Sequence, residues 1–199
     1  MSAGRVREAV AADLPALAEL FSAHMAEQEA WNPLYAGTRN PAFDSLSFLT
    51  QAWAAGADQF RVAEEAERLL GFIRFSIAGG GPPRPPRGRR GLRTWSWRRL
   101  LRMAASLLRR LAERWPEPTQ LGHAPVSGYG YIADLYLIPD RRRQGIGSQL
   151  VDSARQWFQQ QNVEITYLYV FDLNRAGMQF WTKLGFLPYR HTLLRELRS

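Results

Sequence analysis

The sequence predicts an α/β (α+β) fold in which a central mixed, twisted sheet is flanked by helices. Residues 129–138, 146–161 and 164–171 read in order as strand, helix and strand. A crossover helix between two strands implies that the strands are parallel and the connection right-handed. Residues 59–78 read as two antiparallel strands with a turn near 65–67. With 199 residues, 46% of them hydrophobic, the chain can bury one sizeable core.

The first part of the chain predicts a strand and two helices. Residues 5–10 alternate as in a strand, and Asp13 is placed to N-cap the helix that follows. The apolar face of that helix is formed by Leu14, Leu17, Leu20, Phe21 and Met25. Two Asn-Pro pairs make 32–45 a loop, and a second short helix is expected over 46–56.

Residues 79–128 read as an insertion between the third and fourth strands. Gly, Pro and Arg dominate 79–91, whereas 94–115 has the periodicity of a cationic amphipathic helix. Residues 79–122 hold eleven arginines and two glutamates, so the net charge of +8 belongs to this segment and not to the whole domain. Three interpretations stay open: a helix docked on the domain, a surface for an anionic membrane or acidic partner, or an arm that meets nucleic acid without specificity.

The last part of the chain predicts two helices and a final strand. The apolar face of the helix at 146–161 is formed by Leu150, Val151, Ala154, Trp157 and Phe158. Asn174 is expected to open a further helix, which runs through Leu184 and stops at Gly185. Residues 186–197 have the pattern of a last strand.

Composition excludes several kinds of site. The chain has no cysteine, which removes thiol nucleophiles, cysteine-rich zinc sites and disulfides, and no metal site is predicted. The first ten residues are charged where an export signal needs an apolar core. No apolar run approaches the roughly 18–20 residues of a membrane-spanning helix. We therefore expect a cytoplasmic location.

A glycine-containing loop follows the strand at 129–138. A helix start leaves about four backbone N–H groups without partners and carries a partial positive charge. Residues 143–148 thus present backbone N–H donors suited to a diphosphate. The alternative is a glycine-containing turn and a charge run that are simply solvated. Arg141 is expected to be solvated. There is no Gly-Lys-Ser/Thr of a P-loop, and Leu150 stands where a dinucleotide-binding fingerprint needs glycine.

The residues around this loop resemble the central motif of the GNAT superfamily, the acetyl-CoA-dependent N-acetyltransferases. That motif is a strand ending in apolar-x-Pro, then Arg/Gln-x-x-Gly-x-Gly/Ala, then a helix, and Arg142, Gly145 and Gly147 match it in register. Residues 174–186 resemble a second family element, Asn…Phe-Tyr-x-x-x-Gly-Phe. The resemblance covers about 5–78 and 129–190, which leaves only the insertion outside it.

The resemblance implies a set of contacts with acetyl-CoA. Tyr136 and Leu137 would pair through their backbones with the pantetheine arm, in a gap between their strand and the strand at 164–171. Asn174 would contact the pantetheine side. Arg142 stands in motif register, and the pyrophosphate would be held by the backbone N–H groups of Arg143, Gln144, Gly145, Ile146, Gly147 and Ser148.

The implied reaction is direct attack of an amine on the thioester. It needs a neutral amine, reactants at near-attack distance and a stabilised or protonated leaving thiolate. Trp181 stands where many relatives place a tyrosine that protonates the thiolate. Its indole N–H can donate a hydrogen bond or wall the site but does not ionise usefully. Tyr169 and Tyr189 are the nearby substitutes.

The predicted base is Asp134, on the strand that leads to the motif and acting through water. The alternative is a structural acid that orients a loop or pairs with an arginine. Some relatives carry their carboxylate one residue earlier, where this chain has Ala133. His24 is expected to be a core or surface residue, whereas Glu27 and Glu29 could line the amine site.

Residues 1–199 thus read as a single N-acetyltransferase domain with 79–128 inserted. The predicted function is acetyl transfer from acetyl-CoA, as co-substrate, to a primary amine of a small molecule or protein. The alternative is a non-catalytic acyl-CoA-binding or basic-arm module at a membrane surface or acidic partner. No specific nucleic acid is expected, 94–115 is available for peripheral contact with an anionic surface, and the sequence indicates no oligomeric state.

Overall fold

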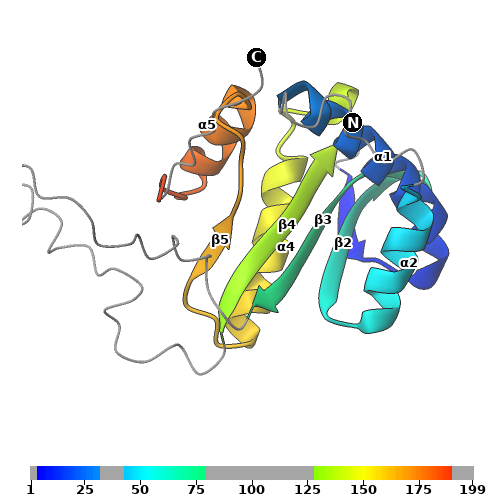
Figure 1. The fold of residues 1–199 in the computed structure, drawn as a ribbon, viewed down its shortest axis with the longest axis horizontal. Coiled ribbons are helices and arrows are strands. Elements are labelled where there is room, and N and C mark those ends of the chain that lie inside the picture. The colour runs from blue at the N-terminus through cyan, green and yellow to red at the C-terminus, as the bar shows by residue number, and fades with distance from the viewer. Residues whose placement is uncertain (1–3, 32–42, 79–127, 190–199) are drawn as a thin grey trace, which may run out of the picture.

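A mixed sheet forms the centre of the protein (Figure 1). The computed structural model describes residues 4–31, 43–78 and 128–189. Within them the strands are β1 (Arg5–Glu8), β2 (Asp58–Glu65), β3 (Arg68–Ala78), β4 (Tyr129–Leu137) and β5 (Thr166–Leu168). They lie side by side in chain order. The pairs β1–β2, β2–β3 and β3–β4 are antiparallel, and the pair β4–β5 is parallel. The predicted mixed sheet is confirmed.

Helices cover both faces of this sheet. Their bounds are α1 (Leu14–Trp31), α2 (Ser45–Ala55), α4 (Ile146–Gln160) and α5 (Arg175–Lys183), with short 3-10 turns η1 (Ala11–Asp13) and η2 (Pro139–Arg141). One face, here called the α1/α2 face, buries Leu17, Phe21, Leu49, Phe60 and Phe72. The opposite α4 face buries Ile73, Phe75, Leu150, Ala154 and Phe158. The apolar stripe predicted for the helix at 146–161 is therefore the stripe that meets the sheet.

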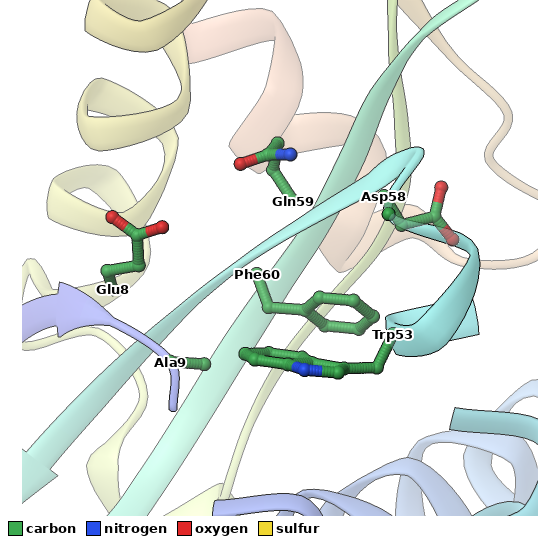
Figure 2. A pocket seen from close by; sticks show the side chains of 7 residues that line it. Glu8, Ala9, Trp53, Asp58, Gln59 and Phe60 are labelled. Carbon is green, nitrogen blue, oxygen red and sulfur yellow. The ribbon is translucent and has the colours of Figure 1, made fainter. Parts of the chain in front are cut away.

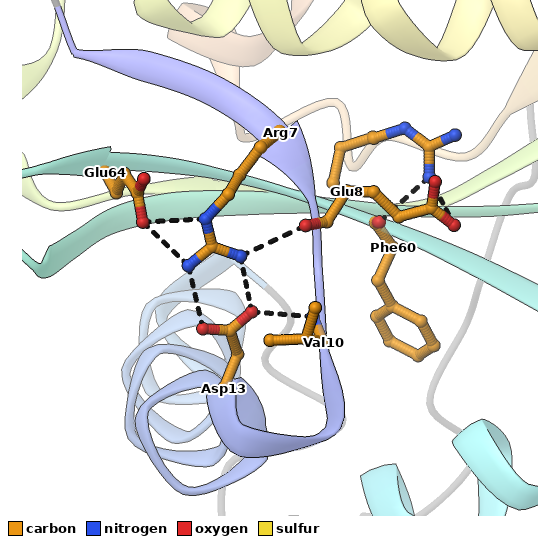
Figure 3. A network of polar contacts seen from close by, with 7 residues as sticks. Arg7, Glu8, Val10, Asp13, Phe60 and Glu64 are labelled. Carbon is orange, nitrogen blue, oxygen red and sulfur yellow. Dashed lines mark hydrogen bonds and ion pairs between the residues drawn. The ribbon is translucent and has the colours of Figure 1, made fainter.

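The connection from β1 to α1 depends on a partly buried ion-pair network (Figure 3). Asp13 does not cap the helix ahead of it: its carboxylate points back, where it accepts the Val10 N–H at 2.7 Å and binds both terminal nitrogens of Arg7 at 2.7 and 2.9 Å. Arg7 Nε also donates to Glu64 of β2 at 2.7 Å. The arginine provides a stronger, charge-assisted partner than the helix N–H groups would, which explains why the predicted N-cap is wrong.

The insertion begins and ends at the same end of the sheet. Ala78 at the end of β3 pairs directly with Tyr129 at the start of β4, so 79–128 replaces what would otherwise be a hairpin turn. The amphipathic helix predicted at 94–115 lies outside the described residues. In the described ranges, no helix combines the length and the apolar character needed to cross a membrane.

The end of the chain departs from the prediction in two places. The strand expected over 164–171 is only three residues long, because β5 pairs with β4 solely from Gly130 to Ile132. Beyond that point the two ribbons diverge toward the end of β4 that leads into α4 (Figure 1). Residues 186–189 carry no strand, and the rest of the predicted last strand lies outside the described residues.

Candidate active site

A bulge in β4 determines which side chains reach the α1/α2 face. Arg74 of β3 pairs with Asp134, but the next β3 residue, Phe75, pairs with Ile132, so Ala133 is an extra residue in β4. Without the bulge, Asp134 would share the α4 face with Ile132, because side chains alternate along a strand. With it, Asp134 faces the same side as Arg74.

Asp134 lies in a buried ion-pair network on that face. It is 8% exposed; its Oδ2 accepts Arg74 Nε at 2.7 Å, and its Oδ1 lies 3.3 Å from His24 Nε2 of α1. Burial alone would raise the pKa of the carboxyl, but the hydrogen bond from His24 and the charge of Arg74 outweigh it and leave the pKa below its usual range. Arg74 also binds Asp58 at 2.7 Å. These contacts fit the structural alternative, an acid paired with an arginine, better than a free base.

The backbone of β4 offers hydrogen-bonding groups where β5 has diverged. Ile138 donates its N–H to Leu70 of β3, so Tyr136, two residues earlier, also directs its backbone toward β3, where it pairs with Phe72. Leu135 and Leu137 direct theirs to the other side. The expected contact with pantetheine therefore suits Leu137 and not Tyr136, whose ring is buried on the α1/α2 face.

The glycine loop ends in an open helix start. Gly145 has φ +85° at the N-cap of α4, a conformation that favours glycine, and among the described residues no side chain caps this end. The first helical hydrogen bond is donated by Gln149 to the Gly145 carbonyl. The N–H groups of Ile146, Gly147 and Ser148 precede that bond, so they are the donors that a pyrophosphate would need.

Two arginines of the loop form ion pairs with other elements of the domain. Arg141, expected to be solvated, instead forms an ion pair at 2.5 Å with Glu65 at the end of β2. Arg142 donates to the Leu137 carbonyl at 2.9 Å and to Glu27 of α1 at 2.5 Å. Arg142 is therefore a link between α1 and the edge of β4, while Arg143 and Gln144 are exposed.

The helix α5 packs over this loop. A Cβ added to Gly147 would lie 3.3 Å from both Leu137 and Phe180, so glycine allows the close approach. Asn174 caps α5 as predicted, by accepting the Gly177 N–H at 2.8 Å. Trp181 packs against Phe180 and Phe186 with ring centroids 5.0 and 5.2 Å apart. Trp181 is thus part of an aromatic group that packs against the core of the α4 face.

Sequence reasoning did not identify a group of three tyrosines beside Asp134. Tyr131 of β4, Tyr167 of β5 and Tyr169 just after β5 have ring centroids 5.0 to 6.0 Å apart. The signal was present as a tyrosine at every second position of 129–131 and 167–169. It could not be used without knowing that the two strands pair in this register.

Two hollows in the surface lie elsewhere. One, of about 180 Å³, is lined by residues of β1, β2 and the end of α2, and in it the rings of Trp53 and Phe60 lie against each other 5.6 Å apart (Figure 2). The other, of about 250 Å³, lies between α1 and the start of α2. Neither includes a β4 or β5 residue, so the candidate site rests on backbone donors and the divergence of two strands. Within the described part of the chain, no group of three acidic or histidine side chains could hold a metal ion.

Comparison with known proteins gives a consistent result. The sequence matches the acetyltransferase (GNAT) family over residues 23–186. A stretch of 61 residues is 36% identical to the probable N-acetyltransferase HLS1 of Arabidopsis thaliana, covering 30% of this chain and 15% of that protein. A stretch of 71 residues is 30% identical to the uncharacterized N-acetyltransferase YobR of Bacillus subtilis, covering 35% of this chain and 29% of that protein. The chain thus matches less than a third of the length of either relative.

Solved structures show the same fold. The tetramutant of the BH1408 protein from Bacillus halodurans superimposes with a TM-score of 0.64 at 18% identity, covering 97% of this chain and 99% of that chain. A GCN5-related N-acetyltransferase from Ralstonia eutropha JMP134 superimposes with a TM-score of 0.61 at 19% identity, covering 97% and 98%. At these identities the similarity concerns the fold, since one fold hosts many functions.

Proposed function

Because this chain belongs to the acetyltransferase (GNAT) family, we propose that it transfers an acetyl group from acetyl-CoA to a primary amine of a small molecule or protein. The observation that carries the proposal is the divergence of β5 from β4 directly beside the uncapped start of α4. The backbone of Leu137, which is directed away from β3, and a positive helix end lie next to one another there. That combination suits an elongated ligand with an amide-bearing arm and a diphosphate.

The residues of the loop divide the binding of acetyl-CoA between them. The N–H groups at the start of α4, with those of Arg143 to Gly145, would hold the pyrophosphate, and the backbone of Leu137 would align the arm. Arg142 is fixed by Glu27 and by the Leu137 carbonyl, so it would shape the entrance and contribute positive charge. The bound thioester supplies the acetyl group; the protein positions the amine against it.

Three side chains, Asp134, Trp181 and Tyr169, are the candidates for roles in proton transfer and at the thioester. The pKa of Asp134 is lowered and its oxygens face Arg74 and His24, so we assign it to positioning the bulge and let water accept the amine proton. Trp181, held between Phe180 and Phe186, would exclude water from the thioester. Tyr169, which follows β5 and is 59% exposed, would be the phenol that protonates the leaving thiolate.

Two measurements test the function. Calorimetric titration with acetyl-CoA should show one site, and Gly147→Val should weaken it at least tenfold, because the added side chain would press on Leu137 and Phe180 at the helix start. Gly56→Ala, at a positive-φ helix end far from the loop, is the control for a general loss of stability. Thiol release from acetyl-CoA over a panel of amines should then show turnover; absence of acetyl-CoA binding would reject the proposal.

A second candidate is an acyl-CoA-binding module without catalysis. It is favoured by one observation: Asp134, the predicted base, and Trp181, which stands where many relatives place the acid, are both engaged in packing or ion pairs. Acetyl-CoA binding without thiol release for any amine would select this candidate.

The remaining assignments extend the proposal beyond the site. We place 1–199 in one domain with 79–128 inserted, located in the cytoplasm. Residues 94–115 are proposed as a peripheral contact with an anionic surface. Deleting 79–128 and joining the paired ends of β3 and β4 with a short turn should leave acetyl-CoA binding intact if the insertion is independent of the site.

A further inference from the structure

Three tyrosines, here called the tyrosine cluster, form a patch across β4 and β5. Tyr131 and Tyr167 are register partners whose rings stack with centroids 5.0 Å apart. Tyr169 meets both rings edge-on, at 6.0 and 5.9 Å. Tyr169 is 59% exposed, and the other two are partly buried. The cluster is therefore an aromatic surface and not part of the packed core.

The cluster lies on the same face as Asp134. A Cβ at Gly130 would point at Phe158 of α4, and Ile132 is buried against α4. Tyr131 lies between them in the strand, so it projects to the opposite, α1/α2 face, as Asp134 does after the bulge. Burial raises the pKa of the Tyr131 phenol, the negative charge of Asp134 raises it further, and the positive charge of Arg74 lowers it. The charges of the Arg74–Asp134 pair therefore act on the cluster.

The charges beside the cluster do not cancel. Arg74 is one positive group bound to two carboxylates, Asp134 and Asp58, at 2.7 Å each. The three together carry a net charge of −1, and their side chains are 9% to 19% exposed. His24, 3.3 Å from Asp134, adds a positive charge only when it is protonated. An unbalanced negative charge next to aromatic rings attracts a cation, because the faces of aromatic rings carry partial negative charge.

We propose that the tyrosine cluster binds a second, cationic group of the amine acceptor. The inference rests on the proposed acetyl transfer and names its substrate class: an amine that carries a separate ammonium or alkylammonium group. The reacting amine must be neutral to attack the thioester, whereas the second group keeps its charge. The ring faces of the cluster and the negative charge of the Arg74 network then select that group.

The test uses two acceptors of matched shape. Each is the same primary amine on the same alkyl chain, ending in a trimethylammonium group in one and in a tert-butyl group in the other. The full-length protein should acetylate the charged acceptor with a kcat/KM at least severalfold higher. Tyr167→Leu should reduce that value by about two- to fivefold, as expected for an exposed cation–π contact. Tyr167→Phe keeps the ring and should retain the preference.

The outcomes separate this inference from the function on which it rests. Equal use of both acceptors, or equal losses for both in Tyr167→Leu, would show an apolar or stacking surface and overturn the inference while acetyl transfer stands. If neither acceptor is acetylated, calorimetry of both amines with the acetyl-CoA-bound protein still compares their affinities. Equal affinities there reject the cationic subsite, and missing acetyl-CoA binding rejects the proposed function.

Discussion

Two buried aspartates illustrate how the same chemistry serves different regions of this molecule. Asp13 and Asp134 are 9% and 8% exposed, and each is bound by an arginine at 2.7 Å that is shared with a second carboxylate. Asp13 is six residues from Arg7 in the chain and accepts a backbone N–H, so it closes a local connection at the outer edge of the sheet. Asp134 is sixty residues from Arg74 and faces His24, beside the point where β4 and β5 separate.

The difference teaches that burial and ion pairing do not by themselves identify a functional acid. Both aspartates have lowered pKa values: the hydrogen bond from Arg7 is the main cause at Asp13, whereas at Asp134 the hydrogen bond from His24 and the charge of Arg74 outweigh burial. Their surroundings distinguish them. Asp13 lies in the connection between β1 and α1, whereas Asp134 lies beside the bulge, the diverging strands and the tyrosine cluster. The Asp13 network should therefore affect stability alone, whereas the Asp134 network should affect stability and acetyl transfer.

The largest effect is expected from Arg74→Ala. It leaves Asp134 and Asp58 buried without their cation, and breaking a buried ion pair by removing one partner costs about 3–5 kcal/mol. Urea unfolding should show a loss of free energy in that range, and Arg74→Lys, which keeps the charge but not the fork, should lose less. A loss below about 1 kcal/mol would mean that the network is effectively solvated.

Arg7→Ala provides the matched change in the other region. The Arg7 side chain is 25% exposed and Glu64 is 21% exposed, so water screens the charges that remain, and a loss of about 1–2 kcal/mol is expected. The kcat/KM for any accepted amine, corrected for the folded fraction, should be unchanged. A loss of activity at temperatures where the variant is folded would contradict the division between the two regions.

Asp134→Asn should lower kcat/KM about tenfold, equivalent to ~1.4 kcal/mol, because it loosens the bulge that positions the reactants. Asp13→Asn is the control and should reduce stability without this loss. A pH–rate profile adds a second readout: if Asp134 were the base, its removal would abolish an acid limb, whereas a positioning residue leaves the profile in shape. Equal turnover of both variants would assign both aspartates to structure.

The smallest effect is expected from pH. Each aspartate has a lowered pKa in the folded state, so it stabilises the fold above the unfolded value near ~3.9 and loses that contribution as pH falls through its folded pKa. Unfolding free energy should therefore decline below about pH 5. Asp13→Asn and Asp134→Asn should each flatten that decline, and parallel pH curves for wild type and variants would show that other groups cause it.

Much of the fold follows from local pattern. The period of two in 59–78 and of 3.6 in 146–161 indicated the β2–β3 hairpin and α4, because these periods place apolar side chains on one face. Two helix boundaries could also be predicted from glycines: Gly145 before α4 and Gly185 after α5 both have positive φ. The length of β5 was not: strand pattern continues to residue 171, but pairing ends where the neighbouring strand diverges.

The sequence by itself therefore determined the order of the described elements and the loop motif of the family, both of which depend on residues close in the chain. Tertiary structure alone decided that Ala133 bulges and aims Asp134 at Arg74, that Arg141 finds Glu65, and that Tyr131 stacks on Tyr167. The physical reason is that these contacts join strands through register. A shift of one residue reverses the face of every side chain, and composition and periodicity do not record the shift.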